Sequence, residues 1–185
     1  MILRLFRPRA EDRSIRDLYG AIVAQARCAV FYRDYAVPDT VQGRFELIVL
    51  HMVLLLDRLN RHDGAGRAMG QQLFDRFCRD LDDNLREMGV GDLNVPKRMR
   101  RFGEAFYQRQ AAYLAAFAAA DARELEKAFL RNIFQGAERE AGAVRLARYA
   151  RQASAQVEAQ EDSALLRGEA VFPDPASIAE AVIHG

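Results

Sequence analysis

Histidine is the first residue type to examine for catalysis or metal binding, because imidazole is both a general base and a common metal ligand. The chain has three. His62 lies in a predicted turn and His184 is the second-last residue, so His51 alone lies inside a predicted helix. A single histidine on so apolar a helix is more often a hydrogen-bonded core residue than a ligand. No His-x-x-x-His or Glu-x-x-His pair occurs, so we expect no metal site.

Residues for nucleophilic or phosphate chemistry are equally sparse. Cys28 and Cys78 lie among apolar neighbours in different predicted helices, which favours buried free thiols over a disulfide. None of the four serines neighbours a candidate base, and no Gly-x-Ser-x-Gly motif occurs. Neither glycine pair, at 64–66 or 89–91, continues as a phosphate-binding loop. We therefore predict a protein that is not an enzyme and needs no cofactor.

Glu46 lies between two apolar residues near the start of the most apolar predicted helix. A buried ionised carboxylate requires a partner, and arginine is the natural one. Arg27, Arg44 and Arg86 are the candidates. A salt bridge at the edge of the core is the favoured interpretation of Glu46, and a contact to a partner protein is the alternative.

Positive charge is concentrated directly after the loop at 89–96. Lys97, Arg98, Arg100 and Arg101 follow one another, and Glu104 alone opposes them nearby. Cations at a helix start oppose the helix dipole. This indicates either an acidic or ribosomal partner or, alternatively, a solvated basic face.

Composition agrees with one globular domain. Of 185 residues, half are hydrophobic and 29% are charged, which argues against a disordered chain or a small disulfide scaffold. The net charge of +1 gives no sign of nucleic acid or membrane. The apolar run at 45–56 is too short to cross a bilayer. Residues 1–9 lack a secretory signal and form either a short amphipathic contact segment or a frayed terminus. We expect a cytoplasmic protein, either free or peripheral at the inner face of the cytoplasmic membrane.

The pattern predicts helices and no strand. The fold class is all-α, a single-domain bundle of about six to seven helices. Residues 1–10 form an N-terminal segment, 11–168 the domain and 169–185 a tail with a short helix. The clearest helices cover 12–33, 41–60, 67–88, from Pro96 or Lys97 to about 117, after the capping sequence 121–124, and 138–160. The last of these is weakly apolar and is expected at the bundle edge.

Several irregular motifs share an order and spacing with a known family. They are residues 18–27, Phe31-Tyr32, 37–47, Leu73-Phe74-Asp75, 85–99 and 104–107 with Arg109. Together they resemble the ubiquinol–cytochrome c chaperone family over about residues 15–118. Many relatives have proline before the Phe-Tyr pair and glycine before Val-Pro-Asp, where this chain has Val30 and Ala36.

The resemblance implies a non-enzymatic, all-helical assembly factor for the cytochrome bc1 complex, in its short bacterial form. The implied partner is newly made cytochrome b, with a small helper protein and no DNA. We expect the client in an apolar groove between the helix at 41–60 and the loop at 89–96. The residues expected to contact it are Glu46, His51, Asp75, Arg86, Asp92, Lys97 and Arg101. Two alternatives stay open: an RNA- or ribosome-binding helical module using 97–101, and a lipid- or small-molecule-binding helical bundle.

Overall fold

The computed structural model describes residues 10–61, 64–135 and 139–178, and within these ranges the only regular elements are helices. Six helices are long and two have five residues each. They are α1 (Ala10–Ala26), α2 (Ala29–Arg33), α3 (Val41–Asn60), α4 (Ala65–Glu87), α5 (Val95–Ala118), α6 (Arg123–Asn132), α7 (Glu140–Glu158) and α8 (Asp162–Leu166). The predicted all-α class is confirmed.

α3 is the central helix, and its predicted bounds are confirmed. It begins after Thr40, whose Oγ1 accepts a hydrogen bond from the Gly43 backbone N–H at 3.1 Å. A Cβ at Gly43 would lie 2.0 Å from the Pro38 carbonyl oxygen, so the entering chain packs directly on the helix. Thirteen of the twenty residues are buried, because other helices cover α3 on several sides.

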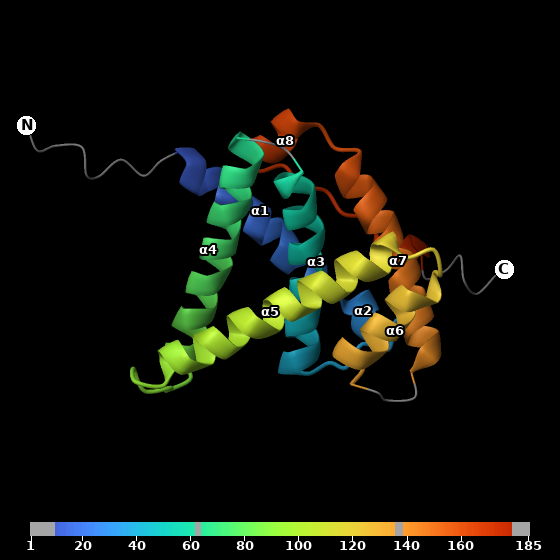
Figure 1. Cartoon of the computed structure of the whole chain (residues 1–185), viewed down its shortest axis with the longest axis horizontal. Helices are drawn as coiled ribbons and strands as arrows, with labels where there is room; N and C mark the ends of the chain where they lie inside the picture. Colours follow the sequence, from blue (N-terminus) through green and yellow to red (C-terminus); the bar gives the residue numbers. More distant parts are fainter. Residues whose placement is uncertain (1–9, 62–63, 136–138, 179–185) are drawn as a thin grey trace, which may run out of the picture.

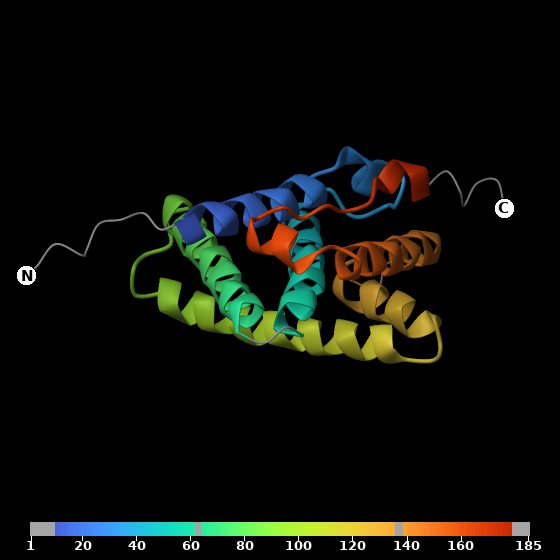
Figure 2. The same ribbon diagram turned by 90° about the horizontal axis from the view of Figure 1, so that it is seen from above.

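The other helices cover α3 from opposite directions. Figure 2 shows α5 along one side of the molecule and α1 along the other, with α3 and α4 between them. α6 and α7 pack together near the C-terminal end of α5, while the loop between α4 and α5 lies at the far end of the long axis (Figure 1). α5 therefore runs the length of the molecule, from this loop to the α6–α7 pair.

The predicted helix at 12–33 is wrong as a single element, because the chain leaves the helix at Arg27 and Cys28. Cys28 has an extended ψ of 123°, and α2 starts after it. The Tyr32 hydroxyl donates to the Ala26 carbonyl at 2.7 Å, which satisfies one of the carbonyls freed by the break. The break turns Phe31 into the core. It involves neither glycine nor proline, so hydrophobic periodicity carries no sign of it.

α7 belongs to the core, and its expected place at the bundle edge is wrong. It contacts α3 and α6 and buries eight residues. Most of these are small, which explains their weak apolar signal: they stabilise by close approach rather than by bulk. At Gly142 an added Cβ would lie 2.4 Å from the Tyr35 carbonyl oxygen. The largest buried side chain of α7, Tyr149, lies in the middle of the domain.

A defined turn joins α4 to α5 at the predicted loop. Gly89 caps α4 with a φ of 78°, a left-handed conformation that glycine adopts without strain. The Asn94 N–H then donates to the Gly91 carbonyl at 2.8 Å, and α5 starts at Val95, one or two residues before the predicted start at Pro96 or Lys97. Met88 is 68% exposed because the helix ends before it.

The described part of the expected C-terminal tail packs against the domain. Gln25 donates to the Pro173 carbonyl and the Tyr35 hydroxyl to the Pro175 carbonyl, at 2.8 and 2.7 Å. Residues 175–178 are helical, and Ile178 is buried. The expectations for residues 1–9, and for the tail after residue 178, lie outside the described residues. Among the described helices, none has the length and apolar character needed to cross a membrane.

Candidate functional site

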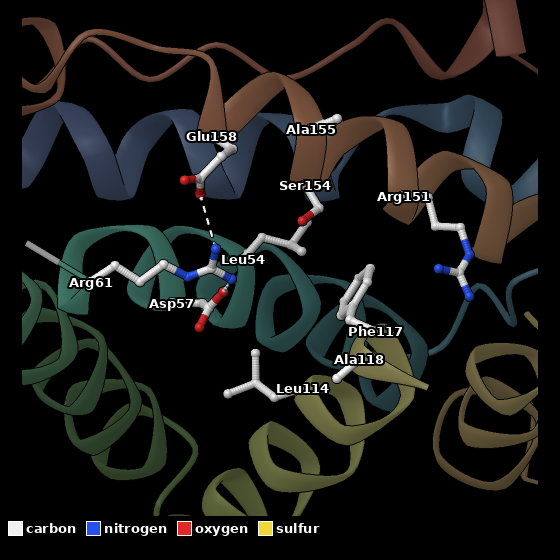
Figure 3. Close-up of a pocket in the computed structure, with 10 residues that line it drawn as sticks. All are labelled: Leu54, Asp57, Arg61, Leu114, Phe117, Ala118, Arg151, Ser154, Ala155 and Glu158. Carbon is white, nitrogen blue, oxygen red and sulfur yellow. Dashed lines mark hydrogen bonds and ion pairs between the residues drawn. The ribbon is translucent and has the colours of Figure 1, made fainter. Parts of the chain in front are cut away.

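A groove with a volume of about 480 Å³ lies where α3, α5 and α7 meet. Figure 3 shows that its lining side chains come from all three helices. The apolar lining consists of Leu54 from α3, Leu114, Phe117 and Ala118 from α5, and Ala155 from α7. We call this set and its charged neighbours the α3–α5–α7 groove. Its wall can take up apolar side chains of a partner.

The ends of the groove are charged. At one end Arg61 is hydrogen-bonded to Asp57 on the preceding turn of α3, and its Nη1 lies 3.5 Å from the Glu158 Oε2 of α7 (Figure 3). The hydrogen bond to Asp57 raises the pKa of the Arg61 guanidinium. At the other end Arg151 donates to the Ala122 carbonyl at 3.3 Å. An apolar segment with polar ends fits this pattern.

A buried ion pair holds α5 across α3. The Glu46 carboxylate has no exposed surface, and Arg109 of α5 donates to it from Nε at 2.6 Å and from Nη2 at 2.5 Å. Gln42 adds a third hydrogen bond at 2.6 Å. These bonds to Glu46 raise the pKa of Arg109. The predicted salt bridge at Glu46 is confirmed, but none of the predicted partners, Arg27, Arg44 and Arg86, supplies it.

His51 is also a packing residue. Its Nδ1 lies 2.7 Å from the Leu47 carbonyl and its Nε2 2.7 Å from the Tyr149 hydroxyl. A carbonyl only accepts, so Nδ1 carries the proton and Nε2 accepts from Tyr149. The Tyr149 oxygen in turn accepts from Gln25 at 2.9 Å. Burial lowers the pKa of His51 to about 4, so the ring is neutral at pH 7.

Glu46 and His51 therefore cannot touch a partner directly, and the expectation that they do is corrected to a positioning role. Both side chains are fully buried, with every polar atom engaged by the protein itself. Glu46 fixes where α5 crosses α3, and His51 fixes where α7 packs on α3. Because the α3–α5–α7 groove lies between these helices, both residues act on its shape.

The other five predicted residues are exposed and lie on α4, α5 and the turn between them. Asp75 accepts from Gln71 at 2.8 Å. Arg86 binds Asp82 at 2.6 Å and also pairs with Asp92, so it ties the end of α4 to the turn. Lys97 and Arg101 extend from the first turns of α5. The predicted groove beside the loop at 89–96 stays a prediction, and the α3–α5–α7 groove lies farther along α5 and includes α7.

The described part of the chain offers little support for metal binding or for a cysteine nucleophile. No group of three or more His, Cys, Asp or Glu side chains there could hold a metal ion. Cys28 and Cys78 are free and half-buried, and burial raises the pKa of both thiols. A half-buried thiol with a raised pKa is a poor nucleophile at neutral pH.

Three comparisons with known proteins agree with one another. The sequence model of the family described as ubiquinol-cytochrome C chaperone matches residues 33–172. The ubiquinol-cytochrome-c reductase complex assembly factor 1 of Xenopus laevis is 25% identical over 116 residues, which are 63% of this chain and 58% of that protein. The crystal structure of the Cbp3 homolog from Brucella abortus superposes with a TM-score of 0.84 at 39% identity, covering 95% of this chain and 98% of that one.

Proposed function

The chain belongs to the ubiquinol-cytochrome C chaperone family, and we propose that it binds newly made cytochrome b during assembly of the bc1 complex, without catalysing a reaction. The Xenopus relative is named an assembly factor for ubiquinol-cytochrome-c reductase, and the chain spans 58% of its length. The match to a Brucella protein over 98% of that chain supports the proposal of a bacterial member.

The observation that carries the proposal is the α3–α5–α7 groove. An unassembled membrane protein presents apolar helices that aggregate in water unless they are covered. The groove offers Leu54, Leu114 and Phe117 as an apolar wall between charged ends. A helical segment binds such a groove through residues spaced three and four apart. The charged ends then set where along the segment the apolar contact begins and stops.

We assign residues 11–168 to the chaperone domain, with 1–10 and 169–185 as flanking segments. The packing of Phe172 against His51, with ring centroids 5.0 Å apart, supports a structural role for the start of the C-terminal segment. The exposed Asp75 and Arg86 of α4 are retained as a second contact region for the client or for a helper protein.

The test blocks the groove without removing core contacts. Ala118 and Ala155 both line the groove and are exposed, so Ala118→Glu and Ala155→Glu place a charge in it at small cost to folding. Ala111→Glu and Ala141→Glu are matched controls, because both residues are exposed on α5 and α7 and neither lines the groove.

The assay is co-purification of newly made cytochrome b with the tagged chain from membranes that are assembling the bc1 complex. We expect the groove variants to co-purify about one tenth as much cytochrome b as the controls. A tenfold loss is the effect expected from removing one strong interface contact. Equal retention by both groups would show that the client binds elsewhere. Failure of the unmodified chain to retain cytochrome b would remove the client itself from the proposal.

A further inference from the structure

Two apolar side chains stand out into solvent at the turn between α4 and α5. Leu93 is 95% exposed and Met88 is 68% exposed. The turn that carries them is ordered by the left-handed Gly89, by the Asn94 to Gly91 hydrogen bond and by the pairing of Arg86 with Asp92. A shaped turn that holds large apolar groups in water indicates a surface built for contact.

Positive charge adjoins these side chains. Lys97, Arg98, Arg100 and Arg101 are all exposed on the first turns of α5, where the helix dipole disfavours cations. Arg100 pairs with Glu104 at 3.2 Å. In the described part of the chain, Lys97, Arg98 and Arg101 make no ion pair, so three cations remain for an external anion.

The acidic groups nearby are mostly engaged by the protein. Asp82 and Asp92 both pair with Arg86, and Asp80 accepts from the Tyr19 hydroxyl at 2.8 Å. Within the described ranges, Asp83 and Glu87 are acidic residues without such a partner, and they lie on α4 rather than on α5. The basic first turns of α5 therefore present one sign of charge beside Leu93.

We propose that residues 88–101, the α4–α5 tip, dock on the surface of an anionic phospholipid bilayer. Leu93 and Met88 enter the boundary between headgroups and acyl chains, and the cations of α5 lie against lipid phosphates. Apolar side chains and basic residues together give reversible surface binding where either alone is weak. The tip lies at the opposite end of the molecule from α6 and α7 (Figures 1 and 2), so docking leaves the α3–α5–α7 groove open.

The chain contains no tryptophan, so the fluorescence of one introduced tryptophan can be measured without background from others. In Leu93→Trp the single indole reports directly on the tip. Its emission should shift to the blue on addition of vesicles of phosphatidylcholine with phosphatidylglycerol, and not with phosphatidylcholine alone. Val171→Trp is the matched control, because Val171 is an exposed apolar residue outside the tip and its emission should stay unchanged.

Co-sedimentation of the full chain with the same vesicles measures affinity. Each basic residue near an anionic surface contributes about fivefold, so Lys97→Gln/Arg101→Gln should weaken binding about 25-fold. Arg131→Gln/Arg148→Gln removes the same charge from exposed sites on α6 and α7 and should leave the affinity for the vesicles unchanged. Leu93→Ser should weaken binding about tenfold.

The proposal is overturned if the unmodified chain binds neutral and anionic vesicles equally, or if the α6–α7 charge variant loses as much affinity as the tip variant. Binding to an RNA homopolymer but not to vesicles would overturn it in favour of the nucleic-acid alternative. None of these results depends on the client in the groove, so the proposed function is tested separately.

Discussion

Replacing Arg109 should show how much the buried ion pair with Glu46 contributes to the free energy of unfolding. Arg109→Met replaces the methylene stem with an unbranched apolar side chain but leaves the Glu46 carboxylate with one hydrogen bond, from Gln42, in place of three. Each bond to a charged group contributes about 1.5–3 kcal/mol, and breaking a buried pair costs about 3–5 kcal/mol. Because Arg109 keeps 19% of its side chain exposed, we expect about 3 kcal/mol, the lower end.

The measurement is the free energy of unfolding in urea, followed by far-UV circular dichroism at pH 7. The double variant Glu46→Gln/Arg109→Met should recover about 2 kcal/mol, because a neutral amide is less costly to bury than a carboxylate. Arg98→Met makes the same change at an exposed site of α5 and should stay within about 0.5 kcal/mol of the unmodified chain.

Two results would refute this reasoning. If Arg109→Met cost less than about 1 kcal/mol, Glu46 would have to be solvated in solution rather than buried. If the double variant were as unstable as the single one, the loss would come from packing of the Arg109 stem and not from the unpaired carboxylate.

The remaining predictions concern the stability effects of His51, of the left-handed residue Ala36 and of two helix glycines. The folded pKa of His51, about 4, lies below its unfolded value of 6.5, so the unfolded state binds more protons as the pH falls. Stability should drop by about 1.2 kcal/mol between pH 6 and 5, and His51→Gln should lack this slope in urea titrations. Ala36 has a φ of 56°, so Ala36→Gly should raise the free energy of unfolding by about 1 kcal/mol, and a fall would show that the left-handed turn is not kept in solution. Gly142→Ala should lower it by about 2 kcal/mol, because the new Cβ would meet the Tyr35 carbonyl oxygen at 2.4 Å. Gly103→Ala, with nothing within 4 Å, should instead raise the melting temperature through helix propensity, and equal effects at the two glycines would contradict the packing.

Local features of the sequence predicted local structure well. Thr40 and Gly89 mark helix ends because their side-chain and backbone properties act within a few residues. The interpretation of His51 as a hydrogen-bonded core residue is confirmed, whereas its expected contact with a client is corrected to a positioning role. The turn before Val37 kept its left-handed backbone although alanine stands at residue 36, because the surrounding fold determines it.

Features that depend on how helices cross were missed. The partner of Glu46 lies 63 residues away on α5, and nothing in the spacing of charges selects Arg109 over Arg44. The importance of α7 was hidden because alanine and glycine stabilise helix packing through proximity, which hydropathy does not record. The groove combines residues from 54–61, 114–118 and 151–158, so only the packed structure brings them together.

The continuity of α5 has a consequence for distance. The helix runs without interruption from Val95 to Ala118. Lys97 and Leu114 are 17 residues apart on it, which at 1.5 Å per residue is about 25 Å. Because the rise per residue of a continuous helix is constant, α5 fixes the distance between the turn and the groove. Along α5, the part of the groove at Leu114 therefore lies at most about this far from any surface that the turn contacts.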